Sequence, residues 1–302
     1  MIGMRVESGA RLGFLAAGVV TAIAPASAAD IPNLAGPWGR NVLYLESPPS
    51  GAGPVMNRMK RPNGSQDGSA LFGDYTNPIL KPATADALKR FGAVSLTGVA
   101  APNPHNQCAP EPTPFTLSIQ FGLQIVQGRD EVLLLYLGDH KVRHVRMNAP
   151  HAEHIVSTLQ GDSVGHYEGD VLVVDTIGVK PGPLGMVDQF GTPYSAALHV
   201  VERYRLIEGK SARDALAQQE KIHPEVIPYP YGRGPLDPDM SKNGLQADVT
   251  VDDPGAFTMP WSARVTYRHV LGEWPEAVCA ENFHEYYANR DTDIPRADKA
   301  DF

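Results

Sequence analysis

One stretch of this chain, residues 161–176, constrains its fold more than any other. It contains two runs of residues that favour β-structure, 163–167 and 171–175, separated by Glu-Gly-Asp. The glycine of this tripeptide, Gly169, can adopt the positive φ that a tight turn requires. The stretch therefore predicts a β-hairpin.

Further short runs of β-prone residues follow along the chain, and turn residues separate them. These runs are 115–126, 131–137, 141–147, 196–206, 247–251 and 262–271. The chain also contains 29 glycines and 27 prolines, which suits many short strands joined by turns. About eight short strands at nearly regular spacing predict a mainly β protein, either a sandwich or a closed antiparallel barrel. We favour the antiparallel barrel.

The N-terminal part of the chain lacks this pattern. Residues 29–114 are rich in Pro, Gly, Asn and Ser, and we expect a long loop region with a short opening strand at 31–38. Ala87, Leu88 and Phe91 share one helical face and predict a helix at 82–91, and we expect a second short helix at 211–222. We expect this irregular segment to pack on a barrel domain formed by residues 115–302.

The first residues have the order of a secretory signal peptide. Basic residues come first, an apolar run at 12–24 follows, and the sequence Ala-Ser-Ala ends at Ala28. A membrane anchor is the alternative, but the apolar run is shorter than the roughly 20 residues that span a bilayer. We therefore predict cleavage near Ala28, a periplasmic or secreted protein, and no integral membrane segment in the mature chain.

Composition narrows the classes of partner and cofactor. The net charge of −8 argues against a nucleic-acid partner, which would require a basic face. The chain has no glycine-rich nucleotide loop, no Cys-x-x-Cys and no haem attachment motif, so we predict no cofactor. The sequence does not indicate an oligomeric state.

The chain has two cysteines, Cys108 and Cys279. In an oxidising compartment an isolated pair favours a disulfide. Two buried free thiols are the alternative. Neither cysteine lies in a recognisable nucleophile motif, so a catalytic cysteine is the least favoured interpretation.

Several motifs together resemble those of a family of exported bacterial proteins. They are GDSVGHYEGDVLVVDT at 161–176, SAALHVVER at 195–203, DPGAFTMPW at 253–261, CAEN at 279–282 and NPILKP at 77–82. The resemblance covers most of the mature chain and implies a calycin-like or lipocalin-like β-barrel that holds an apolar small molecule. It does not indicate a reaction. One departure is Asn148-Ala149-Pro150, where the family has Asp-Gly-Arg, so any role of that arginine is in doubt here.

Three residues are candidates for acid–base chemistry: His166, His199 and Tyr167. Histidine exchanges protons near neutral pH, and no turn requires His166 or Tyr167 at their positions. A hydrogen-bonded histidine in the core or at the rim of the barrel is the alternative for each histidine. Glu168, Gly169 and Asp170 are better explained as turn-forming residues.

Other residues are candidates for ligand binding, because arginine pairs with carboxylates and aromatic side chains line apolar cavities. They are Tyr136, Arg143, Arg146, Arg203, Tyr204 and Trp261. Arg143 and Arg146 lie on opposite faces of their strand, so at most one of them points inward. Structural ion pairs and an aromatic core are the alternatives.

A histidine cluster offers a third kind of site. His140, His144, His151 and His154 fall within fifteen residues and could bind a divalent metal. Their spacing is not that of ligands on one helix face, so a metal site is the weakest of the three possibilities.

Three hypotheses follow. The first is a lyase or isomerase that acts without a cofactor on an apolar or aromatic acid, for example by decarboxylation or elimination. The second is a non-catalytic carrier of hydrophobic molecules, and the third is a metal-dependent enzyme. We rank them in this order, with little separation between the first two.

Overall fold

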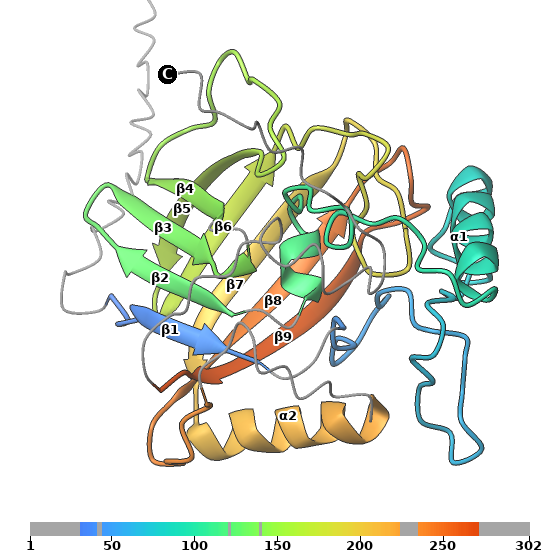
Figure 1. The fold of residues 1–302 in the computed structure, drawn as a ribbon. Helices are drawn as coiled ribbons and strands as arrows, with labels where there is room; N and C mark the ends of the chain where they lie inside the picture. Colours follow the sequence, from blue (N-terminus) through green and yellow to red (C-terminus); the bar gives the residue numbers. More distant parts are fainter. Residues whose placement is uncertain (1–30, 41–43, 120–121, 139–140, 224–234, 272–302) are drawn as a thin grey trace, which may run out of the picture.

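The computed structural model describes residues 31–40, 44–119, 122–138, 141–223 and 235–271. In this part of the chain nine strands form one closed barrel in chain order (Figure 1). The strands are β1 (Gly36–Gly39), β2 (Leu123–Gln127), β3 (Glu131–Tyr136), β4 (Lys141–Met147), β5 (Asp162–Glu168), β6 (Val171–Ile177), β7 (His199–Ile207), β8 (Gly244–Asp252) and β9 (Trp261–His269). The prediction of a mainly β protein with a barrel is confirmed.

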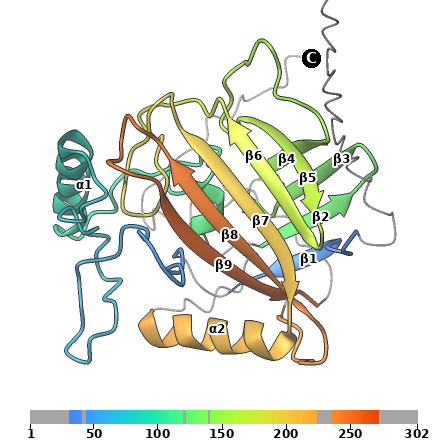
Figure 2. The ribbon, with the colours of Figure 1, turned by 180° about the vertical axis from the view of Figure 1, so that it is seen from behind.

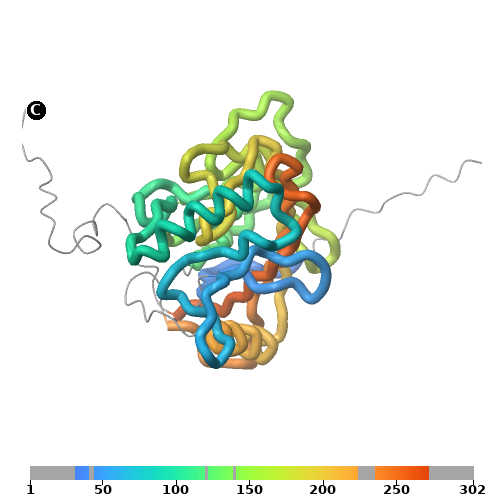
Figure 3. The backbone as a smooth tube through the Cα atoms, turned by 90° about the vertical axis from the view of Figure 1, so that its right-hand side faces the viewer, coloured from blue at the N-terminus to red at the C-terminus, as the bar shows by residue number. Residues whose placement is uncertain are grey.

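Within the described ranges, two α-helices and a 3₁₀ turn accompany the strands. Helix α1 (Pro82–Ser95) lies at the side of the barrel, and α2 (Gly209–Ile222) lies across the end where β7 leads into β8 (Figure 2). The 3₁₀ turn η2 (Phe115–Ser118) precedes β2. Residues 44–119 run along one side of the barrel (Figure 3). Strand β1 closes the barrel by pairing with both β2 and β9.

Alternation of side chains along the strands builds the core. Along β3, for example, Val132, Leu134 and Tyr136 are buried, whereas the residues between them are partly exposed. Inward side chains of the other strands join them in one continuous hydrophobic core. The core also contains charged residues on the inner face, and these define the site described below.

The predicted hairpin is present. Strands β5 and β6 pair antiparallel along their whole length, with His166 opposite Val173. The turn between them contains Gly169 at a φ of 60°, a conformation that glycine adopts without steric strain.

The expectation that all neighbouring strands are antiparallel is wrong at one place. Strand β5 runs parallel to β4, and the two pair only over Val145–Met147 and Ser163–Gly165. Parallel neighbours require a long return connection. Here residues 148–161 carry the chain back along the barrel before β5 begins.

The prediction of one strand over 115–126 is also wrong in its first part. Residues Phe115–Ser118 form η2, and β2 begins only at Leu123. Pro112 and Pro114 lack the backbone N–H that a strand ladder uses. All four residues of η2 are buried, and the Ser118 hydroxyl donates to the Phe115 carbonyl at 2.8 Å.

Candidate functional site

A pocket of about 410 Å³ lies beside the parallel pair of strands. Strand β4 begins at Lys141 but pairs with β5 only from Val145 onward, so its first residues have no β5 partner at that edge. The pocket occupies this edge, and the end of the return connection forms its other wall. It is lined by Pro110, Lys141, Val142, Arg143, His144, Arg146, Thr158, Leu159, Gln160, Gly161, Asp162 and Ser163.

Four of the lining residues are basic and come from one strand: Lys141, Arg143, His144 and Arg146. Arg143 points inward and is 1% exposed, whereas Arg146 points outward, as the alternation predicts. Both residues nevertheless line the same pocket, which lies at the edge of β4. Arg143 and Arg146 therefore line one pocket although their side chains lie on opposite faces of β4.

Arg143 is ion-paired inside the barrel. Its Nη2 donates to Glu202 Oε2 of β7, and its Nη1 donates to the Thr113 hydroxyl at 3.3 Å. The other oxygen of Glu202 accepts a hydrogen bond from the Tyr204 hydroxyl at 3.0 Å. Burial, reinforced by the Glu202 carboxylate, raises the pKa of Tyr204 well above its ordinary value. Each carboxylate oxygen of Glu202 therefore accepts a hydrogen bond from a buried side chain.

Tyr136 of β3 lies next to this group. Burial raises its pKa to about 12, although the positive charge of Arg143 acts in the opposite direction. Three predicted ligand-binding residues, Tyr136, Arg143 and Tyr204, thus come together inside the barrel. Trp261, the first residue of β9, is also buried, and its ring packs edge-on against Phe257 with 5.7 Å between ring centroids.

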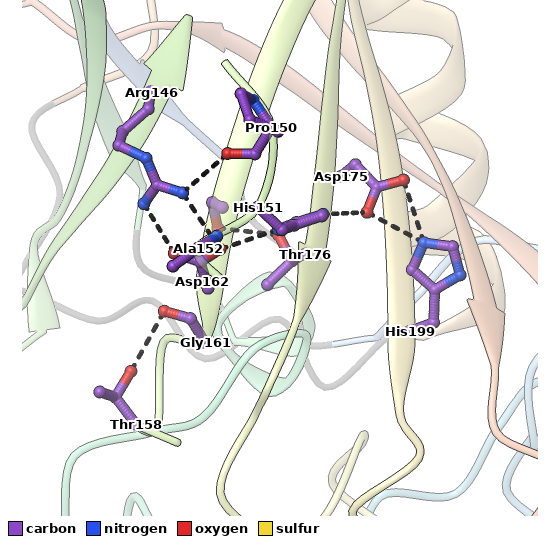
Figure 4. Close-up of polar contacts among 11 residues, drawn as sticks. Arg146, Pro150, His151, Ala152, Thr158, Gly161, Asp162, Asp175, Thr176 and His199 are labelled. Atoms are coloured by element: carbon purple, nitrogen blue, oxygen red, sulfur yellow. Dashed lines mark hydrogen bonds and ion pairs between the residues drawn. The ribbon is translucent and has the colours of Figure 1, made fainter. Parts of the chain in front are cut away.

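A second polar group is built around Arg146 and Asp162, which both line the pocket (Figure 4). Arg146 binds Asp162 through two hydrogen bonds, from Nη1 to Oδ1 at 2.6 Å and from Nη2 to Oδ2 at 3.1 Å. His151 Nδ1 lies 2.8 Å from Asp162 Oδ2, and the Ala152 N–H donates to the same oxygen. The hydrogen bonds from Arg146, with those from His151 and Ala152, hold the pKa of Asp162 well below its usual range.

The chain of contacts continues from His151 across the outer face of the barrel. His151 Nε2 lies 3.0 Å from Asp175 Oδ1, and His199 Nε2 lies 3.0 Å from the same oxygen (Figure 4). Both contacts of His151 can be hydrogen bonds only when the ring is a doubly protonated imidazolium, because carboxylates accept and do not donate. His151 therefore fastens the return connection, residues 148–161, to β5 and β6.

The other candidates lie away from the pocket lining. His166 Nε2 contacts Glu168 Oε1 at 3.0 Å, and Arg203 Nη1 donates to Glu168 Oε2 at 2.6 Å, on the exposed end of the hairpin. Tyr167 is half-buried and its hydroxyl accepts a hydrogen bond from Gln127 at 2.8 Å. The structure therefore brings His199 into the outer group but places His166, Tyr167 and Arg203 elsewhere.

The histidine cluster is dispersed in the residues that the structure describes. His144 contacts Glu131 at 2.7 Å, His151 binds the two aspartates, and His154 is exposed. His140 lies outside the described residues. Within the described ranges, no three His, Cys, Asp or Glu side chains are arranged to hold a metal ion.

Two further predictions concern segments outside the described ranges. Residues 1–28 and Cys279 both lie there, so the signal peptide and the Cys108–Cys279 disulfide stay predictions. Among the described helices, none combines the length and the apolar character needed to cross a membrane.

Sequence reasoning missed Asp162, Asp175 and Glu202 as members of the site. Each is an acidic residue within a strand of otherwise β-prone residues, where acidic side chains are uncommon. An acidic residue in a predicted strand is therefore the sequence signal that could have identified these three residues. Their partners could not be found from it, since all three contact residues on other strands or on the return connection.

In comparisons with known proteins, no protein family, no curated protein and no solved structure gives a significant match to this chain.

Proposed function

We propose that this barrel binds a small organic acid in the pocket between β4 and β5. The observation that supports this most is the gathering of Lys141, Arg143, His144 and Arg146 around one pocket of about 410 Å³. Small-molecule sites generally have volumes of roughly 300–1,000 Å³ and a few well-placed polar groups. The pocket meets both conditions.

The chemistry of the lining selects the ligand. Guanidinium groups bind carboxylates through paired hydrogen bonds, as Arg146 already does with Asp162. Pro110, Val142 and Leu159 supply apolar wall. A carboxylate attached to an apolar or aromatic body fits this combination.

A second candidate is a lyase or isomerase reaction on such an acid, without a cofactor. One observation favours it: Asp162, His151, Asp175 and His199 form a continuous chain of contacts that ends at the pocket wall. Such a chain can move a proton between the wall and the outer face. A carrier of the same acid would use the pocket without turnover, so binding is the broader proposal.

The test of binding is calorimetry with benzoate. We expect Arg146→Gln to weaken binding by about tenfold, the loss of one charge-assisted pair. Arg203→Gln is the matched control, because Arg203 is also a half-exposed arginine paired with a carboxylate, but on the hairpin. Equal effects of the two substitutions, or none from Arg146→Gln, would contradict the proposal.

Turnover separates the enzyme from the carrier. A panel of aromatic acids would be incubated with the protein and with His151→Ala, and the products followed by chromatography. Product formation that disappears in His151→Ala, with benzoate still bound, supports the lyase or isomerase. Binding without product in either protein supports the carrier.

We also infer that the protein is exported and that Cys108 pairs with Cys279. The basic, apolar and small-residue order of residues 1–28 supports the first inference, and the oxidising compartment supports the second. Intact mass of the purified protein, before and after reduction and alkylation, would reveal cleavage near Ala28 and the bond.

A further inference from the structure

Strand β4 has an open stretch of main chain where it borders the pocket. Alternate residues of a strand direct their N–H and C=O groups to opposite edges. The Met147 N–H donates to the Asp130 carbonyl on the β3 side at 2.9 Å. The main-chain groups of Val142 and His144 therefore point the other way, toward the pocket that both residues line.

Among the described residues, no strand lies opposite this stretch. Strand β5 pairs with β4 only over Val145–Met147, and its register would place Gly161 opposite Arg143. The chain turns away instead, because the Gly161 N–H donates to the Thr158 carbonyl and the Thr158 hydroxyl donates to the Gly161 carbonyl, both at 3.2 Å. Gly161 has a φ of 72°, which glycine adopts without strain. The place of one strand residue is thus left open.

The existing parallel pairing shows how a residue in that place would bind. Gly165 lies opposite Met147, and its carbonyl accepts from the Asn148 N–H, one residue further along, at 2.7 Å. By the same pattern, a residue opposite Arg143 would accept from the His144 N–H and donate its own N–H to the Val142 carbonyl. An exposed strand edge is a template for such pairing.

The surroundings indicate what lies on either side of this residue. Only residues 142–144 are open, which leaves room for one paired residue and not for a long peptide. A residue that runs parallel to β4 directs its carboxyl end toward Arg146. Its amino end is directed toward Lys141, which contacts Glu111 next to the apolar Pro110 of the pocket wall.

We propose that the acid bound in this pocket is an N-acyl amino acid with an apolar or aromatic acyl group. Its amide N–H donates to the Val142 carbonyl, and its carboxylate accepts from the His144 N–H on the side of Arg146. This rests on the proposed function, which it narrows from organic acids in general to acids that carry an amide N–H on the carbon next to the carboxylate.

The first test compares hippurate, which is N-benzoylglycine, with benzoyloxyacetate, in which an ester oxygen replaces the amide N–H. The two acids have the same charge and nearly the same size. Calorimetry should show hippurate binding about tenfold more tightly, because the ester leaves the Val142 carbonyl without a donor. Equal affinities would overturn the inference.

The second test removes the other main-chain group. His144→Pro lacks the N–H, whereas the matched variant His144→Ala lacks the same imidazole but keeps the N–H. Proline is compatible with a strand position whose N–H has no ladder partner. His144→Pro should bind hippurate about tenfold more weakly than His144→Ala, and equal affinities would contradict the proposed pairing.

Hydrogen exchange in the unmodified protein needs no substitution and supplies an independent readout. The His144 amide is open in the ligand-free protein, so saturating hippurate should slow its exchange by at least about tenfold, as measured by NMR. Unchanged exchange would overturn the inference even if His144→Pro did not fold.

The inference and the proposed function fail differently. If benzoate binds and Arg146→Gln weakens it, but hippurate and benzoyloxyacetate bind equally, the pocket stands and the N-acyl amino acid is wrong. If benzoate, hippurate and benzoyloxyacetate all fail to bind, both proposals are wrong.

Discussion

Arg143 and Glu202 form an ion pair across the inside of the barrel, although their strands, β4 and β7, are separated by two others. Both residues are almost completely buried, at 1% and 0% exposure. The pair therefore joins the strand that borders the pocket to the far wall of the barrel.

Breaking this pair should be strongly destabilising. Glu202→Gln keeps the size of the side chain but leaves the Arg143 guanidinium buried without a counter-charge, which costs about 3–5 kcal/mol. Urea denaturation measures the free energy of unfolding. Glu168→Gln, which breaks the exposed pair with Arg203, should cost less than about 1 kcal/mol. Similar costs for the two substitutions would show that the interior pair is hydrated.

The Arg146–Asp162 contact should make the free energy of unfolding decrease at acidic pH. The pKa of Asp162 is lowered in the folded protein, first by hydrogen bonds from Arg146, so the stabilising contribution is present above the unfolded value of about 3.9. It is lost as the pH falls below that value and through the lower pKa of the folded state. In Asp162→Asn this loss is absent. The difference in unfolding free energy between the two proteins should shrink steadily from pH 5 downward, and a constant difference would contradict the prediction.

Asp188 should have the opposite effect on stability, which it should decrease as the pH rises. It is buried in the connection between β6 and β7, where burial raises its pKa to about 6 despite hydrogen bonds from Thr192 and Phe190. The folded protein therefore binds a proton between about pH 4 and pH 6 that the unfolded chain has released, and stability falls as the pH rises through this range. Each unit of pKa difference corresponds to about 1.4 kcal/mol.

The matching variant is Asp188→Asn, which cannot ionise. Its unfolding free energy relative to the unmodified protein should rise by roughly 2–3 kcal/mol between pH 4 and pH 7. Urea titrations at several pH values give this difference directly. A flat difference would mean that Asp188 ionises in the folded protein as readily as in the unfolded chain.

Gly165, the one glycine within strands β5 and β6, should be costly to replace. A Cβ atom there would lie 2.8 Å from a methyl group of Val145 and 3.1 Å from the sulfur of Met147, within the parallel pairing of β4 and β5. Gly165→Ala should therefore destabilise the protein by about 1–3 kcal/mol. Gly182→Ala, where nothing lies within 4 Å, should change stability by less than about 0.5 kcal/mol. Denaturation of both variants tests the contrast.

Local signals were enough to predict the hairpin and the alternation of Arg143 and Arg146. Gly169 supplies its own turn geometry, and the faces of a strand follow from its period of two. The same signals failed at Phe115–Ser118, because η2 depends on the surrounding prolines and on burial more than on β propensity.

The contacts of the site depend on the register of the strands and on the path of the connections between them. Neither can be predicted from the spacing of residues in the sequence. The sequence offers His151 only as a weak candidate for a metal ligand, in a cluster of nearby histidines, whereas its partners are Asp162 and Asp175 on two later strands. His199 was correctly expected on a strand face, yet its contact with Asp175 follows from the pairing of β6 with β7. Both partners are therefore set by the pairing of β5, β6 and β7 and by the path of the return connection.

The parallel contact between β4 and β5 has an arithmetic origin. A ring with an odd number of members cannot alternate between up and down all the way round, so at least one pair of neighbours must share a direction. This ring has nine strands, and β4 and β5 are the pair that does. The short pairing, the return connection and the pocket are thus consequences of parity. A relative with one strand more or fewer could close without a parallel pair, and would have no need of an opening at this position.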